Sequence, residues 1–384
     1  MSDTLAPPAQ SLERSSRWDE VLEWSGSVRA VAVMRIALGP ITLLHLRPFL
    51  ADALDGVSYD DHFWEPFVPW LPQLPDGVWF GLLWVGAAAA VLMTIGLWTR
   101  LATATAFTVV AVNLLLSQTH FRHNRAFLAI LLGGMALLSS GRVLSLDAWW
   151  RRRRLRPTLP VVAPLWPLWL LRVQVCLVYL ASGISKLVDR DWFGGLVLWD
   201  RVVRYQYVLD PTPLPGWAVD TLTSRWLYYA VGPAAVLTEL FIGVGLWFGR
   251  TRLAAVWIAI MFHVMIEVSA SVEVFSLAAL AALAVWVAPS TRDRTLRVGG
   301  DAHVSGVVIA LVRAGDWFGR FRIERGEPAE PVLTVVERGG TVRTGGEAAS
   351  LVLSRLPVFF ALAWPVSAVL SSRARWRRPV AGAA

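Results

Sequence analysis

Long apolar segments are the feature of this chain that most limits its fold. Several of them reach the ~18–20 consecutive apolar residues that an α-helix needs to cross the hydrocarbon of a bilayer. A helix also satisfies its backbone hydrogen bonds internally, as a segment without access to water must. The sequence therefore predicts an integral membrane protein built as a bundle of α-helices.

Composition agrees with this prediction. Hydrophobic residues make up 55% of the chain and charged residues only 17%, which is less charge than a soluble protein of this size carries. The 21 tryptophans suit a protein with two membrane–water interfaces, where indole rings anchor. Residues 1–18 lack a basic segment followed by an apolar one, so no cleaved signal peptide is expected. The first apolar segment is predicted to be a retained span.

Eight segments are predicted to cross the membrane, with seven or nine as alternatives. The predicted spans are residues 27–49, 78–98, 101–116, 126–144, 167–187, 226–248, 253–268 and 274–287. A mixed stretch at 191–217 is predicted to be partly helical and to lie at the membrane interface. Residues 28–290 therefore form the predicted transmembrane domain.

Arginines between the spans predict the orientation of the bundle. Short loops rich in Lys and Arg stay in the cytoplasm, and the strongest such signal is the run at 151–156. Placing that run inside also places both chain ends and the turns at Arg100 and 249–252 inside. The net charge of +8 is thereby explained by topology, so no nucleic-acid partner is expected. The basic turn at 120–125 falls on the outer side.

One lysine stands out among the basic residues. The chain has 36 Lys and Arg residues, and Lys186 is the only lysine. A lysine can lose its proton and act as a base, whereas an arginine effectively cannot. Lys186 is therefore the first candidate for a catalytic residue. The alternative is an interfacial lysine whose stem lies along the apolar surface and whose head reaches water.

After residue 290 the sequence changes character. Alternating segments such as residues 331–336 are typical of strands, and Arg338-Gly339-Gly340 is a turn signal. The apolar run at 356–370 is interrupted by proline and is short for a span. The predicted organisation is a cytoplasmic tail at 1–27, the transmembrane domain at 28–290 and a small cytoplasmic α/β domain at 291–384.

Several motifs in the transmembrane domain match those of a known family. They are Val31-Ala32-Val33-Met34-Arg35-Ile36-Ala37-Leu38-Gly39, Leu171-Arg172-Val173-Gln174, Tyr179, Gly183-Ile184-Ser185-Lys186-Leu187, Asp191-Trp192 with Gly194, Glu239, and Phe262-His263. Over about residues 28–290 the chain resembles the HTTM (horizontally transferred transmembrane) family, which includes vitamin K-dependent gamma-carboxylase. The resemblance implies a lyase-type membrane enzyme that uses a reduced quinone.

The resemblance also implies roles for individual residues. Lys186 matches the base that deprotonates the hydroquinone. Such a base needs a lowered pKa, which burial near a membrane interface would supply. His123, Asn124 and Arg125 match an Asn-Asn-His turn in which the asparagine is kept and the histidine is replaced by Arg125. We expect this turn to bind substrate, with His123 as a substitute proton relay. The other predicted binding residues are Asp191, Trp192, Glu239 and His263, and no metal site is predicted.

The tail carries a second resemblance. Segments from Asp301-Ala302-His303-Val304-Ser305 to Leu356-Pro357 are similar to the DCC-type thiol-disulfide oxidoreductase domain over about residues 295–375. The two cysteine positions of that domain are Ala302 and Ser305 here. Thiol–disulfide exchange requires a dithiol, and Cys176 is the only cysteine of the chain. We therefore expect a thioredoxin-like domain without redox activity.

Two functions follow from these observations. One is a membrane enzyme, similar to a quinol-dependent carboxylase or epoxidase, with Lys186 as general base. The other is a non-enzymatic membrane factor for export or maturation of a secreted or membrane partner. Nothing after residue 290 matches the peptide-binding region of the carboxylase, so carboxylation of protein glutamates is not expected. A transporter is ranked last, because the sequence lacks a detectable inverted repeat.

Overall fold

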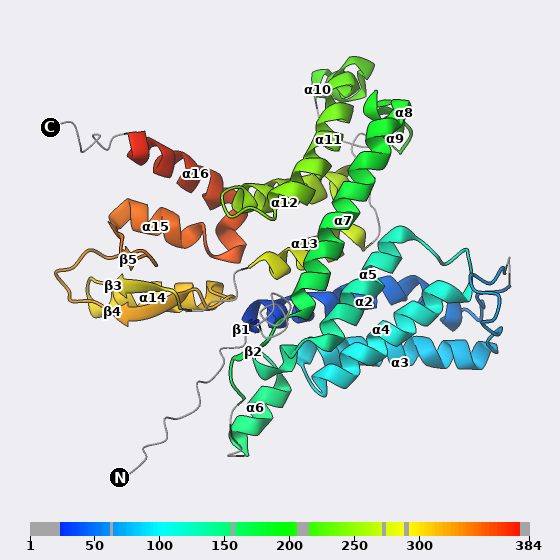
Figure 1. Ribbon diagram of the computed structural model, residues 1–384, viewed down its shortest axis with the longest axis horizontal. Helices are drawn as coiled ribbons and strands as arrows, with labels where there is room; N and C mark the ends of the chain where they lie inside the picture. The colour runs from blue at the N-terminus through cyan, green and yellow to red at the C-terminus, as the bar shows by residue number, and fades with distance from the viewer. Residues whose placement is uncertain are drawn as a thin grey trace, which may run out of the picture.

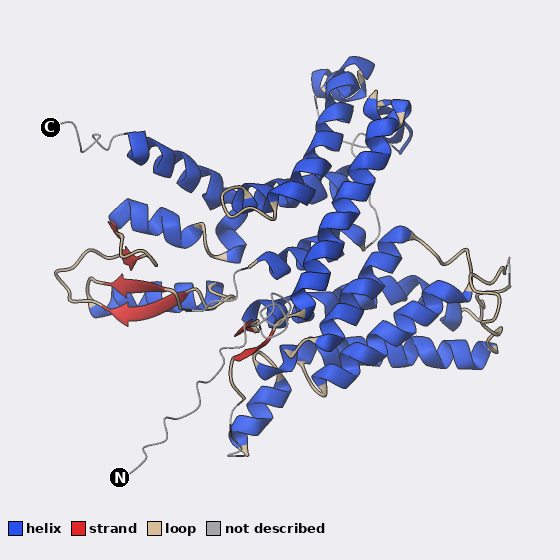
Figure 2. Ribbon diagram, viewed as in Figure 1, coloured by secondary structure: helices blue, strands red, loops and turns tan. Residues whose placement is uncertain are grey.

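The computed structural model describes residues 24–61, 64–154, 157, 159–205, 215–270, 274–287 and 292–376 of the 384-residue chain. Most of the predicted tail at 1–27 and Arg156 of the predicted cytoplasmic loop lie outside the described residues. Within the described residues the chain is mainly helical, with a two-stranded sheet near its start and a four-stranded sheet near its end (Figure 2).

Four consecutive helices form the first unit of the bundle, coloured blue to cyan in Figure 1. They are α2 (Arg29–Leu54), α3 (Asp76–Ile95), α4 (Thr99–Leu116) and α5 (His123–Leu137). Small residues let these helices approach closely, as membrane helices commonly do. A Cβ at Gly86 of α3, for example, would lie 2.6 Å from Val109 Cγ1 of α4. Apolar side chains such as Leu38, Leu83 and Leu128 are fully buried between the helices.

A short connecting region follows the first unit. It contains a 3₁₀ turn, η1 (Ser140–Arg142), and the helix α6 (Leu146–Arg153), whose last turn carries the arginine run. Strands β1 (Ser25–Ser27) and β2 (Val162–Pro164) then pair antiparallel. This pairing brings the start of the chain next to the segment that follows the arginine run.

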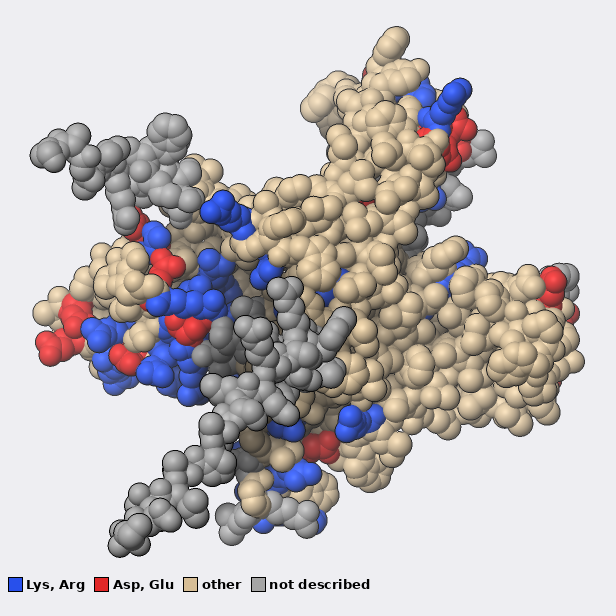
Figure 3. Space-filling model, in the orientation of Figure 1, with Lys and Arg blue, Asp and Glu red and all other residues tan. Residues whose placement is uncertain are grey.

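A second group of helices extends away from the first in Figure 1. It comprises α7 (Pro167–Val188), α8 (Arg190–Phe193), α9 (Leu196–Tyr205), α10 (Gly216–Thr223) and α11 (Arg225–Gly245). Helices α7 and α11 pack along each other, and we call this pair with α8–α10 the α7–α11 arm. Figure 3 shows a notch between this arm and the first unit, and few charged side chains over either of them in that view.

Two further segments connect the arm to the C-terminal domain. Helix α12 (Arg252–Ala270) follows α11, and α13 (Phe275–Ala282) continues into the 3₁₀ segment η2 (Leu283–Trp286). Residues of α13 and η2 such as Ala278 and Val285 are buried in the same core as α2 and α5.

The C-terminal domain is a small α/β unit with its own core. Strand β3 (Arg294–Val298) lies between β4 (Phe321–Arg325), which is parallel to it, and β5 (Thr334–Val336), which is antiparallel. Strand β6 (Val342–Thr344) completes the order β4-β3-β5-β6. The domain's helices are α14 (Ala302–Gly315), α15 (Gly345–Leu353) and α16 (Pro357–Trp376). The predicted strand at 331–336 is found in part, as β5.

Five described helices are long and apolar enough to span a membrane: α2, α3, α4, α7 and α11. They match the first, second, third, fifth and sixth predicted spans. The fourth prediction corresponds to α5, whose 15 residues rise only about 22 Å, less than the ~30 Å of hydrocarbon. The eighth corresponds to the eight residues of α13 and the turn η2. The apolar run at 356–370 lies in α16, a helix that continues through Pro365.

Candidate functional site

Lys186 lies in the last turn of α7 and forms an ion pair with Glu239 of α11. Lys186 Nζ is 2.6 Å from Glu239 Oε1 and 2.9 Å from Ser182 Oγ. Ser182 also donates to Glu239 Oε1, at 3.1 Å. The side chain of Glu239 is 6% exposed and that of Lys186 is 20% exposed. The lysine therefore joins a buried carboxylate to the surface of the arm.

The spacing of residues along α7 explains how this site forms. Positions 179, 182, 183 and 186 fall on one helical face because they are three or four residues apart. Gly183 brings α11 close to this face, since a Cβ there would lie 2.9 Å from Leu240 Cδ2 and 3.4 Å from Glu239 Cβ. The short distance between the helices places the Glu239 carboxylate within reach of Lys186.

Trp192 covers the lysine from the side of α8. Lys186 Nζ lies 4.7 Å from the centre of the Trp192 ring, within the range of a cation–π contact. Asp189 positions this ring, because its carboxylate accepts from the backbone N–H groups of Asp191 and Trp192. Asp191 itself is exposed. Of these two predicted binding residues, Trp192 contacts the lysine directly and Asp191 belongs to the turn that holds Trp192.

Tyr179 and His263 form a second polar pair, deeper in the bundle. The Tyr179 hydroxyl lies 2.6 Å from His263 Nε2, and both side chains are buried. The other ring nitrogen, Nδ1, has no hydrogen-bond partner among the described residues. His263 was predicted to be a binding residue. In the structure the His263 ring of α12 lies beside Tyr179, and Tyr179 is on the same face of α7 as Lys186.

Only one of the two carboxylate oxygens of Glu239 accepts hydrogen bonds from the described residues. Oε1 accepts from Lys186 and Ser182, whereas the buried Oε2 lacks a hydrogen-bond partner among the described residues. Most buried polar atoms in proteins are hydrogen-bonded. The enclosed Oε2 therefore keeps an unused acceptor site close to the ammonium group of Lys186.

The predicted turn His123-Asn124-Arg125 lies at the start of α5. Arg125 donates to the His120 carbonyl at 3.2 Å and stacks on Phe49 at 5.0 Å. His123 packs edge-on against Phe121. Figure 1 shows the start of α5 and the end of α7 on separate arms, with the notch of Figure 3 between them. The role of this turn in substrate binding stays a prediction.

His120 was not singled out from the sequence, yet it is the centre of an aromatic cluster. Its ring packs against Phe49, Tyr59 and Trp79, and its Nδ1 lies 3.0 Å from the Asn113 carbonyl. Burial lowers the pKa of His120 below its ordinary value of 6.5, and the charge of Arg125 lowers it further. In the sequence, the many aromatic residues between positions 49 and 80 were the feature that could have indicated this cluster.

Two buried arginines of the family motifs hold the bundle together. Arg35 is fully buried and donates to the carbonyls of Met93 at 2.5 Å and Leu144 at 2.5 Å. Arg172 donates to the Val285 carbonyl at 2.9 Å and lies among three tryptophan rings. Both residues fix helix positions. Within the described residues, no group of three His, Cys, Asp or Glu side chains could hold a metal ion.

A comparison with known protein families matches most of the chain. The family model described as the HTTM domain matches residues 27–290, which is more than half of the chain. The chain belongs to the HTTM family. The HTTM region includes Lys186, Glu239, Trp192 and His263, and with its apolar helices it makes this an integral membrane protein that crosses the bilayer several times. No curated protein and no solved structure matches the sequence.

Proposed function

We propose that this HTTM protein is a membrane enzyme that removes a proton from the hydroxyl group of a quinol-type lipid. Lys186 is the base, and Glu239 takes up the proton that Lys186 must first lose. The observation that carries the proposal is the contact of the only lysine with a buried carboxylate whose second oxygen has no partner among the described residues.

In the proposed reaction a proton first moves within the ion pair. Transfer of one proton from Lys186 Nζ to Glu239 Oε1, 2.6 Å away, leaves both groups neutral. The free amine then takes a proton from a hydroxyl group and becomes an ammonium group. That ammonium stabilises the oxyanion which forms beside it.

The residues present fit a quinol. A quinol bound there would supply the hydroxyl proton and the reducing equivalents. Lys186 Nζ is partly exposed and can meet the hydroxyl group, and Trp192 beside it is an aromatic neighbour for the head group. Lys186 is partly exposed at the end of α7, so the isoprenoid part of such a lipid can stay in the bilayer. The notch in Figure 3 lies beside the α7–α11 arm, and the end of α7 that carries Lys186 is predicted to face the outer side.

The rival function is a non-enzymatic factor that assists export or maturation of a secreted or membrane partner. Its support is that Lys186 already contacts a carboxylate, a hydroxyl and an aromatic ring, as a lysine that only joins two helices would. The two functions differ in what arginine does at position 186. An arginine preserves the charge and the helix contact but cannot serve as a base.

For topology, we propose that residues 1–27 and 291–384 lie in the cytoplasm. The start of α2 contacts the C-terminal domain, since Arg29 Nε donates to the Trp317 carbonyl at 2.7 Å. The β1–β2 pair brings the same end of the bundle near the arginine run. These contacts support placing the start of α2, the arginine run and the C-terminal domain on the same side of the membrane, which the positive-inside rule assigns to the cytoplasm.

For the C-terminal domain, we propose a thioredoxin-like unit without redox chemistry. Its parallel β-α-β segment followed by an antiparallel hairpin and a helix supports this relationship. Ala302 and Ser305 lie in the first turn of α14, which Asp301 caps. A helix start is where reactive cysteines of such domains gain their low pKa, and this chain has alanine and serine there.

The unique lysine allows a direct test of substrate class. A membrane-permeable acylating reagent modifies one side-chain amine in this chain, Lys186. We expect reduced menaquinone to protect Lys186 from acylation in detergent-solubilised protein, measured by peptide mass spectrometry. The dimethyl ether of the same quinol lacks the hydroxyl groups and should protect poorly. Equal protection by both compounds, or by neither, would contradict the proposed quinol site.

A further inference from the structure

A cavity lies away from Lys186, where α2, α12 and α13 meet the C-terminal domain. Its volume is about 710 Å³, within the range of small-molecule sites. One wall comes from α2, α12, α13 and η2, and the other from the C-terminal domain. The described residues that line it include none from α7 or α11, so it is separate from the proposed active site.

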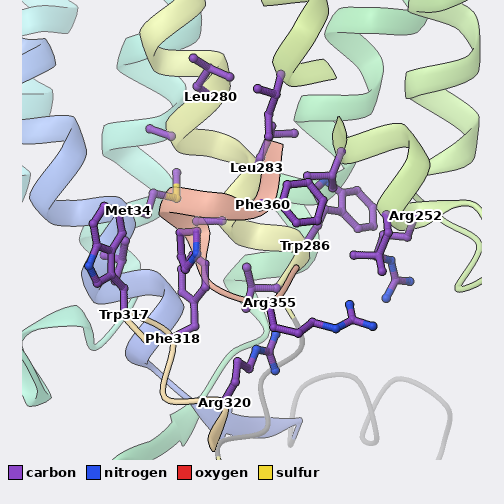
Figure 4. A pocket seen from close by; sticks show the side chains of 18 of the residues that line it. Met34, Arg252, Leu280, Leu283, Trp286, Trp317, Phe318, Arg320, Arg355 and Phe360 are labelled. Atoms are coloured by element: carbon purple, nitrogen blue, oxygen red, sulfur yellow. The ribbon is translucent and has the colours of Figure 1, made fainter. Parts of the chain in front are cut away.

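The cavity has an apolar end and a cationic end. Figure 4 shows Leu280 and Leu283 at the apolar end, Phe360 beside them, and Arg320 and Arg355 at the opposite end. Further apolar side chains from the membrane helices continue the first wall. A ligand that fills this space must combine an apolar chain with an anionic group.

Five arginines line the cavity: Arg252, Arg294, Arg320, Arg338 and Arg355. Asp293 pairs with three of them, at 2.9 Å from Arg294 and 3.9 Å from Arg320, and also contacts Arg338.

Two other carboxylates, Asp316 and Glu337, lie near these arginines, and both already have other partners. Asp316 accepts from the backbone N–H groups of Arg320 and Phe321, and Glu337 pairs with Arg343 at 2.6 Å. Within the described residues, these three carboxylates are fewer than the five arginines that line the cavity.

Two arginines of this cluster are only partly hydrogen-bonded within the described residues. The Arg294 side chain is 11% exposed, and its Nε, like that of Arg355, has no hydrogen-bond partner among the described residues. Burial, together with neighbouring arginines, lowers the pKa of Arg320 and of Arg355 to about 10. Buried donors and like charges of this kind are costly unless an anion satisfies them.

We propose that this cavity binds an anionic phospholipid, with the phosphate on the arginine cluster and an acyl chain along the apolar wall. A guanidinium group matches phosphate oxygens with two parallel hydrogen bonds. A membrane lipid fits better than a soluble phosphate because α2, which forms part of the apolar wall, is one of the helices long and apolar enough to span a membrane. The rest of the lipid stays in the bilayer, so the cavity holds only its head group and part of a chain.

The test measures lipid retention by native mass spectrometry of the delipidated full-length protein in a neutral detergent. The probes are phosphatidylglycerol, phosphatidylcholine with the same chains, and glycerol phosphate as the free head group. We expect wild type to bind phosphatidylglycerol about tenfold more tightly than phosphatidylcholine, and glycerol phosphate weakly. Arg320→Gln combined with Arg355→Gln should remove this preference.

Three further variants make the test selective. Arg338 is about half exposed, so Arg338→Gln should fold normally and still weaken phosphatidylglycerol binding. Ala281→Trp fills the apolar end without changing any charge and should weaken it as well. Arg297→Gln is the matched control, since Arg297 lies on β3, is 52% exposed and does not line the cavity.

Three results would overturn the proposal. One is equal affinity of wild type for the two lipids. Another is unchanged phosphatidylglycerol binding in Arg338→Gln and in the double arginine variant. The third is binding of glycerol phosphate as tight as that of phosphatidylglycerol with no effect of Ala281→Trp, which would assign the arginines to a soluble phosphate compound.

Discussion

Lys186 Nζ lies 2.6 Å from Glu239 Oε1, and this contact joins the end of α7 to the middle of α11. The two charges cancel inside an apolar arm, and Ser182 bonds to both residues. Charged groups inside membrane helices are costly and tend to mark functional sites. The pair therefore has two separable consequences, one for stability and one for proton transfer.

Removing the lysine alone should destabilise the arm more than removing the pair. Lys186→Met leaves the buried Glu239 carboxylate without its cation, and we expect a loss of about 2–3 kcal/mol, less than for a fully buried pair because Lys186 is partly exposed. Adding Glu239→Gln should recover part of that loss. The measurement is reversible unfolding in mixed micelles, analysed as a double-mutant cycle.

Arg190→Met is the matched control for this cycle, because Arg190 is an exposed cation in the adjacent helix α8. It should change stability by less than about 0.5 kcal/mol. Strictly additive effects of Lys186→Met and Glu239→Gln would contradict an interaction between the two residues.

Close packing of the α8–α9 turn against α11 should control the position of Trp192. A Cβ at Gly232 would lie 2.7 Å from Gly195 Cα and 2.8 Å from the Phe193 carbonyl oxygen, both backbone atoms that cannot rotate away. We expect Gly232→Ala to cost about 1–3 kcal/mol and to increase acylation of Lys186, since Trp192 moves off it. Gly81→Ala has open space around it and should be neutral or slightly stabilising. Equal behaviour of the two variants would rule out this packing effect.

Arginine is required at position 35 because its donors reach separate carbonyls. Arg35 bonds to Met93, Thr94 and Leu144, which belong to α3 and to the segment before α6. Lysine keeps the charge but lacks the planar fork, so Arg35→Lys should lower the stability by about 2–4 kcal/mol. Arg47→Lys, on the exposed side of α2, is the control and should have little effect. The check is the midpoint of thermal unfolding in detergent.

Protonation of His120 should weaken the first unit at acidic pH. Because the folded-state pKa is below the ordinary value of 6.5, the unfolded chain binds the proton more readily. The stability from neutral His120 is therefore complete above about pH 6.5 and falls as the pH drops toward the folded-state value. His120→Gln should flatten this part of the pH–stability curve, whereas His123→Gln, on the exposed side of the same turn, should leave it unchanged. Identical slopes for wild type and His120→Gln would contradict this role.

Much of the membrane architecture could be predicted from the sequence, because apolar length is a local property. Five predicted spans are helices of sufficient length. The fourth and eighth segments differ because α5 ends at Leu137, before a turn rich in Ser and Gly, and α13 passes into the 3₁₀ segment η2. Both departures depend on turn geometry, which composition alone does not specify.

The site was predicted residue by residue but not as a pair. Lys186 and Glu239 each stood out, one as the only lysine and one as a residue that matches a family motif. Their contact depends on how α7 crosses α11, which Gly183 and Leu240 determine through packing between positions far apart in sequence. The aromatic cluster of His120 and the arginine-lined cavity depend in the same way on elements that meet only in the folded chain.

The most direct test of the central claim is quinol turnover by wild type and Lys186→Arg. Each purified protein receives reduced menaquinone or vitamin K, oxygen and labelled bicarbonate, and quinone epoxide is measured by mass spectrometry. We predict epoxide from wild type and at least about 100-fold less from Lys186→Arg, because arginine cannot act as the base. No epoxide from either protein, with Lys186→Arg as stable as wild type and equally able to complement a deletion, would contradict the enzyme account and favour the maturation factor.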